Sequence, residues 1–174
     1  MASGERVLIA LGSNIDRERK LPEAVRHLGG RHGIEVLATS PVYETRPVGG
    51  EEQPAFFNAA VLVETRLGLE ELKRVLREIE SSLGRVRTAD KNAPRTIDLD
   101  IAMVGSRELE IDGTKVPDPS IGRRPHLALP LADVAPDWVY PPKGMTLREL
   151  AAGMETSEAE IRRVTDTDVR LSGP

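Results

Sequence analysis

Ala93-Pro94-Arg95-Thr96-Ile97-Asp98-Leu99-Asp100-Ile101 is the stretch from which both the sheet and the site are predicted. Successive side chains of a strand point to opposite faces, so Ile97, Leu99 and Ile101 line one face and Asp98 and Asp100 share the other. Two neighbouring carboxylates repel each other unless a cation lies between them. Oxygen ligands of this kind suit Mg²⁺ completed by phosphate oxygens. The alternative is an ordinary half-buried strand whose outer face is acidic.

A basic loop lies directly before the two aspartates. Residues 84–95 hold Arg85, Arg87, Lys91 and Arg95 against Asp90 alone. The planar guanidinium of arginine matches phosphate with two parallel hydrogen bonds. A basic loop followed by paired carboxylates therefore predicts a site for polyphosphate and its metal, and the alternative is a solvated loop whose charges serve solubility.

Composition limits the classes of protein to which the chain can belong. Its 174 residues are enough for one domain with a sizeable core, and the lack of cysteine excludes disulfides and thiolate sites. A net charge of -4 argues against a general nucleic-acid surface. No run of 18 apolar residues exists, and the first residues lack the apolar core of a signal peptide. We expect a cytoplasmic monomer that contacts neither nucleic acid nor membrane.

Hydrophobic periodicity predicts the order strand, helix, strand, strand, helix, strand. The predicted elements are residues 6–11, 21–28, 34–43, 58–65, 69–83 and 96–104. Gly12, Ser13 and Asn14 predict a turn between the first strand and the first helix. This order is the ferredoxin-like βαββαβ arrangement, an α+β fold with an antiparallel sheet and helices on one face. The other face is then free to form a site, and Asp98 and Asp100 would point there.

The C-terminal part has weaker patterns. Asp112-Gly113 predicts a hairpin within residues 108–116, residues 136–142 have no regular pattern, and residues 147–154 and 158–164 predict short helices. We expect one domain over residues 1–174. It would consist of a core of about residues 5–142 and a helical extension of about residues 145–174.

A long loop, residues 44–57, separates the second and third predicted strands. Loops of this length are usually functional in compact domains. It ends in Phe56 and Phe57, of which alternation sends one to the core and leaves the other free to stack on a planar ligand. The amide of Asn58 can read the donor and acceptor edges of a heterocycle. The alternative is that the two phenylalanines only anchor the loop to the core.

Taken together, these segments resemble the 6-hydroxymethyl-7,8-dihydropterin pyrophosphokinases, folate-pathway enzymes that move diphosphate from ATP to a pterin alcohol. The resemblance covers about residues 7–142. Its strongest block is residues 91–101, and the blocks at residues 10–14, 40–45, 53–60 and 84–87 follow the family order and spacing.

The resemblance implies the roles of individual residues. It implies that two Mg²⁺ ions on Asp98 and Asp100 bridge the phosphates of the co-substrate ATP, and that Asp98 is a candidate to accept the proton of the pterin hydroxyl. The implied catalytic residues are Asp98, Asp100, Arg85 and Arg95. The implied ATP-binding residues are Glu80, Arg87, Arg95, Asp118 and Arg124. The implied pterin-binding residues are Thr45, Val48, Phe56, Asn58 and His126.

Three positions depart from the family pattern. Asp118 stands where most members have a histidine, His126 where an aromatic completes the pterin sandwich, and Asn92 where some members have a tryptophan. An acidic Asp118 repels phosphate unless arginine or metal offsets it, so we expect weaker ATP binding than in typical members. From another class, the chain could be a non-catalytic ferredoxin-like nucleotide- or pterin-binding or regulatory domain. Retention of both aspartates and Arg95 argues against that alternative.

Overall fold

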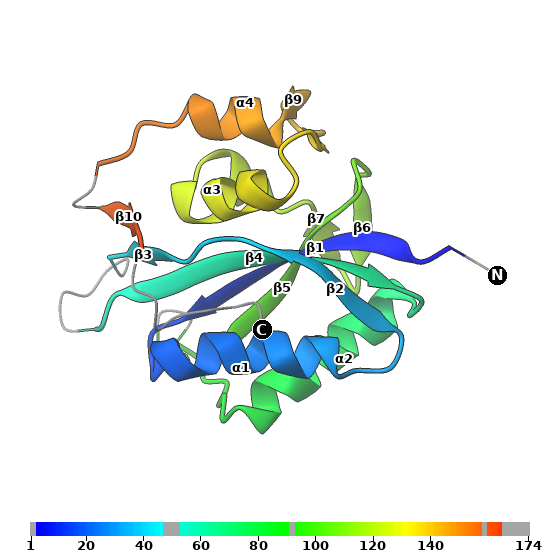
Figure 1. Ribbon diagram of the computed structural model, residues 1–174, viewed down its shortest axis with the longest axis vertical. Helices are drawn as coiled ribbons and strands as arrows, with labels where there is room; N and C mark the ends of the chain where they lie inside the picture. Colours follow the sequence, from blue (N-terminus) through cyan, green and yellow to red (C-terminus); the bar gives the residue numbers. More distant parts are fainter. Residues whose placement is uncertain (1–2, 47–52, 91–92, 158–159, 165–174) are drawn as a thin grey trace.

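A six-stranded antiparallel sheet forms the middle layer of the molecule (Figure 1). The computed structural model describes residues 3–46, 53–90, 93–157 and 160–164. The sheet has the strand order β10-β3-β4-β1-β5, and β2 also pairs with β4. Its strands are β1 (Glu5–Ser13), β2 (Ile34–Thr39), β3 (Tyr43–Thr45), β4 (Phe56–Thr65), β5 (Asp98–Val104) and β10 (Ile161–Arg163).

Two helices cover one face of this sheet, α1 (Arg17–Gly29) and α2 (Leu69–Ser82). The predicted apolar stripe of α2 is buried at Leu72, Leu76 and Ile79. Ile97 and Leu99 are buried in the same core, which confirms that the apolar face of their strand points inward. The element order and strand order confirm the predicted ferredoxin-like α+β fold.

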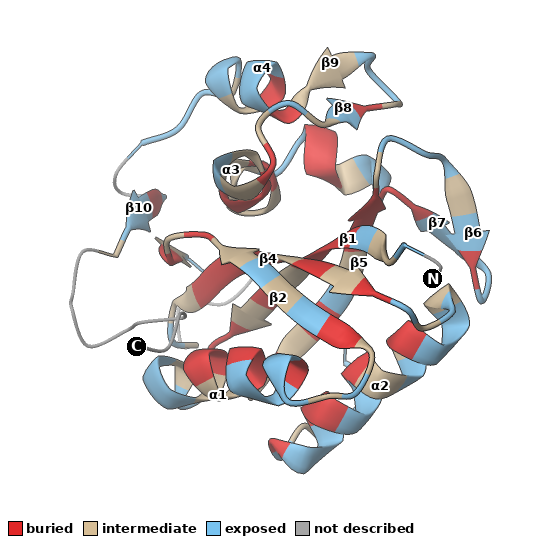
Figure 2. Ribbon diagram, turned by 45° about the vertical axis from the view of Figure 1, so that its right-hand side comes forward, coloured by how far each residue is buried: buried red, intermediate tan, exposed pale blue. Residues whose placement is uncertain are grey.

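The opposite face is not free along its whole length, and this expectation was incomplete. The helix α3 (Pro125–Val134) packs on it with the short 3₁₀ helix η1 (Pro119–Gly122) beside it, and α4 (Leu147–Ala152) packs on the outer side of α3. A second core forms there around Leu8, Ala60 and Leu131. Figure 2 shows buried residues on α1 and α2 below the sheet and on α3 above it. Only the part of this face that α3 leaves open can hold a ligand.

Several predicted boundaries were wrong. The expected helix at residues 158–164 is a strand at residues 161–163, because the unpaired edge of β3 offers hydrogen bonds that β10 takes up. Residues 158 and 159 lie outside the described residues. The predicted strand 34–43 is divided into β2 and β3 around Pro41, which has no amide hydrogen to donate. Gly12 and Ser13 lie within β1 instead of in a turn.

The remaining small elements follow the main fold. The predicted hairpin is formed by β6 (Leu109–Ile111) and β7 (Thr114–Val116), with positive φ at Asp112 and Gly113. Residues 136–142, expected to be irregular, contain β8 (Val139–Tyr140), which pairs with β9 (Met145–Thr146). In the described part of the chain, no helix has the length and apolar character that a membrane span requires.

Candidate active site

The floor of the site is a cross-strand row on the face away from α1 and α2. Gly12 of β1 lies opposite Asp98 on one side and Asn58 on the other, and Asn58 lies opposite Tyr43. Directly opposed residues of an antiparallel sheet present their side chains to the same face. In the next row Ala10 lies opposite Asp100. Because Gly12 and Ala10 have little or no side chain, the centre of the floor stays open.

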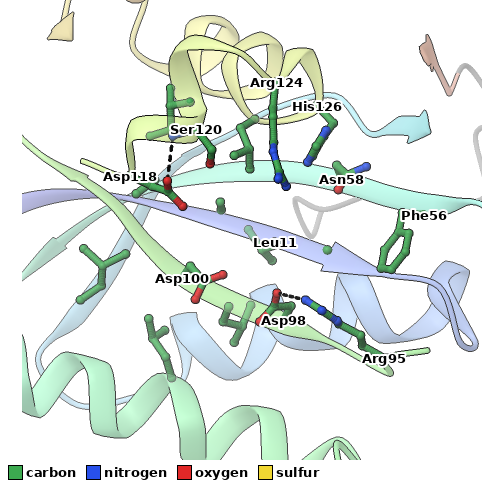
Figure 3. A pocket seen from close by; sticks show the side chains of 18 of the residues that line it. Leu11, Phe56, Asn58, Arg95, Asp98, Asp100, Asp118, Ser120, Arg124 and His126 are labelled. Atoms are coloured by element: carbon green, nitrogen blue, oxygen red, sulfur yellow. Dashed lines mark hydrogen bonds and ion pairs between the residues drawn. The ribbon is translucent and has the colours of Figure 1, made fainter. Parts of the chain in front are cut away.

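A cavity of about 550 Å³ lies on this floor. Figure 3 shows Asp98 and Asp100 on β5 at its base, Arg124 and His126 reaching in from the opposite side, and Phe56 beside Asn58 at one end. Sequence-predicted residues that line it are Thr45, Phe56, Asn58, Glu80, Arg87, Arg95, Asp98, Asp100, Asp118, Arg124 and His126. Val48, Lys91 and Asn92 lie outside the described residues.

Two arginines hold Asp98. Arg85 Nη1 lies 2.7 Å from Asp98 Oδ1, and Arg95 Nη1 lies 2.9 Å from Asp98 Oδ2. Arg85 is 12% exposed and also donates to the Ile97 carbonyl oxygen at 2.9 Å, so it lies behind the aspartate and not among the residues that line the cavity. Arg95 lines the cavity itself. Arg85, Arg95 and Asp98 were predicted to lie together, and they do. Of these two arginines, only Arg95 lines the cavity.

Ser13 and Asn14 explain how the Arg95 segment is placed. Asn14 Oδ1 accepts from the Arg95 amide at 2.7 Å, and Ser13 Oγ donates to the Thr96 carbonyl oxygen at 2.6 Å. Asn14 Nδ2 also donates to Gln53 Oε1 at 3.1 Å, which joins the end of the long loop to the same point. Sequence reasoning assigned these residues to a turn and missed this role. The buried polar side chain of Asn14 could not be recognised from its spacing.

The carboxyl group of Asp100 lines the cavity beside that of Asp98. The residue is exposed to the cavity, but partial desolvation by the surrounding protein, followed by the charge of Asp98, raises the pKa of Asp100 to about 6. Among the described residues no group of three or more His, Cys, Asp or Glu side chains gathers to hold a metal. Two carboxylates that need further oxygen ligands from a phosphate fit Mg²⁺, which is usually bound in this way.

Glu80 is a buried acid beside these residues. It is 2% exposed, and its oxygens lie 3.1 Å from Arg85 Nη1 and 3.2 Å from Arg87 Nη2. Burial raises the pKa of Glu80 to about 7, although both arginines act in the opposite direction. Glu80 thus keeps its proton in the folded protein over a pH range in which the unfolded chain has lost it.

Replacing Glu80 by Gln is expected to flatten the pH dependence of stability. Between the ordinary pKa of 4.5 and about 7 the folded state binds more protons than the unfolded state, so this group makes the free energy of unfolding fall as pH rises. Urea unfolding at about pH 5 and about pH 8 should show that the parent loses about 1–3 kcal/mol more than Glu80→Gln. Glu78→Gln, an exposed change on the same helix, should behave like the parent. Parallel curves for parent and Glu80→Gln would contradict this assignment.

The other end of the cavity presents flat and amide groups. Asn58 Nδ2 donates to Thr45 Oγ1 at 2.8 Å, which fixes the orientation of the Asn58 amide. Burial, followed by the charge of Arg124, lowers the pKa of His126 to about 4. The imidazole is therefore neutral at physiological pH and can stack as a planar ring. Phe56 lines the same end, whereas Phe57 is buried in the core, as alternation predicted.

The side chain of Asp118 stabilises the start of η1. Its Oδ1 accepts from the Ser120 amide at 2.8 Å and caps η1. Asp118 also lines the cavity, as do Arg124 and Ser120. The carboxylate is therefore held by its own turn while it contributes negative charge to the cavity wall.

The chain is similar to known proteins over most of its length. The family model described as 7,8-dihydro-6-hydroxymethylpterin-pyrophosphokinase (HPPK) matches residues 8–136. The chain belongs to the HPPK family. The matched range of the HPPK model includes the cross-strand floor, the basic loop, both aspartates and the helix α3.

Curated relatives and a solved structure extend this result. The chain is 38% identical over 156 residues to the 2-amino-4-hydroxy-6-hydroxymethyldihydropteridine pyrophosphokinase of Methylorubrum extorquens, covering 89% of this chain and 97% of that protein. It is 39% identical to the folic acid synthesis protein fol1 of Pneumocystis carinii over 82% of this chain, but spans only 19% of that protein. A crystal structure of an HPPK-DHPS in complex with substrates shares the fold, with a TM-score of 0.65 at 15% identity over 86% of this chain and 43% of that chain.

Proposed function

We propose that this protein transfers diphosphate from ATP to 6-hydroxymethyl-7,8-dihydropterin, giving AMP and the pterin diphosphate in folate biosynthesis. The observation that carries the proposal is the position of Asp98 and Asp100 on the floor of one cavity, between a basic end and an aromatic and amide end. Relatives of this family bear the name of this pyrophosphokinase.

The basic end suits a nucleotide. Lys73 of α2 donates to the Ile111 carbonyl oxygen and to Thr114 Oγ1 of the β6–β7 hairpin, both at 3.3 Å, and so joins two walls of the cavity. Leu76 and Ile111 provide apolar surface there, and the cations that line the cavity as a whole outnumber its acids. The lining cations are Arg46, Lys73, Arg77, Arg87, Arg95, Lys115 and Arg124, and the acids are Glu80, Asp98, Asp100 and Asp118. An apolar slot with surrounding cations fits a base and its phosphates.

The opposite end suits a pterin. Phe56 and the neutral ring of His126 can contact the two faces of a flat heterocycle, and Asn58, held by Thr45, can pair with its edge. Val48, expected in this pocket, lies outside the described residues. The hydroxymethyl group of a pterin bound here would point along the floor toward Asp98.

Transfer requires mainly positioning and charge stabilisation. Asp98 and Asp100 would hold magnesium, which when bound neutralises phosphate charge and stabilises the charge that develops during transfer. Arg95, 2.9 Å from Asp98, can reach phosphate oxygens beside that carboxylate, and Arg85 holds Asp98 from behind. The pterin oxygen forms its bond to the β-phosphorus as the bond from that phosphorus to the AMP oxygen breaks. Asp98 accepts the hydroxyl proton and returns it to solvent.

Incubation with Mg²⁺, ATP and the reduced hydroxymethylpterin, followed by separation of the nucleotides, tests this function. AMP formed in equal amount to pterin diphosphate supports diphosphate transfer. ADP would indicate a simple kinase. Tight binding of both ligands with no nucleotide change would favour the second candidate, a non-catalytic ligand-binding domain.

Asp118→Asn is expected to tighten ATP binding. Asn keeps a side-chain oxygen that can accept from the Ser120 amide, but it removes a negative charge from the cavity wall. The Kd for an ATP analogue measured by calorimetry should fall about two- to fivefold. Asp118→His should act in the same direction. An unchanged or higher Kd in both variants would contradict the explanation that Asp118 weakens ATP binding.

Three further expectations stay predictions. We propose that residues 1–174 form one pterin pyrophosphokinase domain with a core of about residues 5–142, and the pairing of β10 with the core sheet supports this. Size-exclusion chromatography with light scattering would test the monomeric state. The cytoplasmic location rests on the sequence alone.

A further inference from the structure

The row of residues that makes the floor of the cavity continues beyond it to β10. Arg163 lies opposite Tyr43, Tyr43 lies opposite Asn58, and the row then passes through Gly12 to Asp98. Five strands therefore present one residue each to the same face. Arg163 is two strands away from Asn58, roughly 10 Å, and is not among the residues that line the cavity.

At its outer end this row is fastened to α3. The hydroxyl of Tyr43 donates to Asp133 Oδ2 at 2.5 Å and accepts from Arg163 Nη2 at 3.2 Å. Arg163 Nη2 also lies 3.3 Å from Asp133 Oδ1, and its guanidinium lies 5.7 Å from the centre of the Tyr43 ring. Tyr43 is 7% exposed, so the cluster is sheltered on its tyrosine side.

The two elements that Arg163 joins carry opposite walls of the cavity. On β3, Thr45 is two residues from Tyr43 on the same face and accepts from Asn58. On α3, His126 lies in the first turn and Asp133 near the last residue. Because α3 is a continuous helix, fixing its far end against β3 also limits where His126 can lie relative to Asn58.

We propose that Arg163 is a positioning residue for the pterin end of the cavity: it sets the spacing between the Thr45–Asn58 wall and the His126 wall by binding Tyr43 and Asp133 together. This role rests on the proposed function, because the ligand at that end is the pterin. The nucleotide end is built by α2 and the β6–β7 hairpin, which Arg163 does not join.

Arg162 offers a matched control on the same strand. It is 57% exposed, close to the 54% of Arg163, and pairs with Glu44 at 2.8 Å on the other side of the strand. Calorimetry should show that Arg163→Gln raises the Kd for the pterin about five- to tenfold and leaves the Kd for an ATP analogue within about twofold of the parent. Arg162→Gln should change neither Kd. In turnover, Arg163→Gln should raise KM for the pterin with little change in kcat.

A second readout does not need a ligand. Amide hydrogen exchange at residues 43–45 and along α3 should be faster in Arg163→Gln than in Arg162→Gln. Tyr43→Phe should weaken pterin binding similarly, and combining it with Arg163→Gln should give less than the sum of the two losses.

Equal weakening of both ligands, the same loss in Arg162→Gln, or an unchanged pterin Kd and exchange rate in Arg163→Gln would each overturn this role while leaving the proposed function standing. A parent protein that binds no pterin would overturn both.

Discussion

Asp100→Asn is expected to reduce diphosphate transfer by about 10²- to 10³-fold or more, while making the free protein more stable above about pH 6. Partial desolvation in the cavity and the charge of Asp98 raise the pKa of the Asp100 carboxyl to about 6, so at neutral pH the folded protein carries an unfavourable charge there. Asn has nearly the same shape and no charge. It therefore relieves the repulsion but cannot replace a carboxylate as a magnesium ligand.

The sign of the stability change follows from proton linkage. A folded-state pKa above the ordinary 3.8 means that ionisation of Asp100 destabilises the fold as pH rises from about 4 to about 6. Thermal unfolding above this range should give a higher Tm for Asp100→Asn, and steady-state assays should show the lost turnover. Asp137→Asn, a change at an exposed ion pair with Arg148, is the control for both measurements. If Asp100→Asn is active and has the Tm of the parent, Asp100 does not belong to the active site.

Asp98→Asn should lose activity as strongly but differ in stability. Asp98 is held by Arg85 and Arg95, and its removal leaves both guanidinium groups without this partner. We therefore expect no gain in Tm for this variant. The contrast between two adjacent aspartates separates a structural from a catalytic effect.

Gly12→Leu is expected to remove pterin binding and leave the fold intact. A Cβ atom at Gly12 would meet only Asn58 Oδ1, at 3.5 Å, which is an ordinary contact. The rest of a leucine side chain must extend into the cavity over the row that joins Asn58 to Asp98. Occupied space on this floor excludes a ligand that lies across it.

Calorimetry should find the Kd for the pterin raised at least about 100-fold in Gly12→Leu, with a Tm close to that of the parent. Gly12→Ala adds a single methyl group and should give a smaller loss, so the two variants form a graded series. Normal pterin affinity in Gly12→Leu would show that the ligand does not cross this floor. A large fall in Tm would show instead that β1 does not tolerate a side chain here.

The sequence predicted those parts of the site that follow from local alternation. Asp98, Asp100 and Phe56 face the cavity because a strand alternates its side chains, and this rule needs no knowledge of the fold. The sheet and its two helices followed from period-2 and period-3.6 patterns for the same reason. Arg124 and His126 were named through a family resemblance, since their own segment gave no periodic signal.

Relations across the sheet could not be predicted in this way. In the sequence, Gly12 only marks the end of an apolar run. Its position between Asn58 and Asp98 depends on the pairing of three strands, which the sequence pattern does not give. Asn14 reads as a turn residue, although it holds the Arg95 amide 81 positions further along the chain. The strand β10 was wrongly expected to be helical, because its conformation depends on the open edge of β3 and not on its own residues.

A crystal structure of the protein with Mg²⁺, a non-hydrolysable ATP analogue and the hydroxymethylpterin would show whether Asp98 and Asp100 hold magnesium against the phosphates. We expect metal density between Asp98 and Asp100 in contact with the phosphates, and the pterin between Phe56 and His126 with its hydroxyl toward the phosphate chain. Ligands bound outside this cavity, with both aspartates away from any metal, would contradict this expectation.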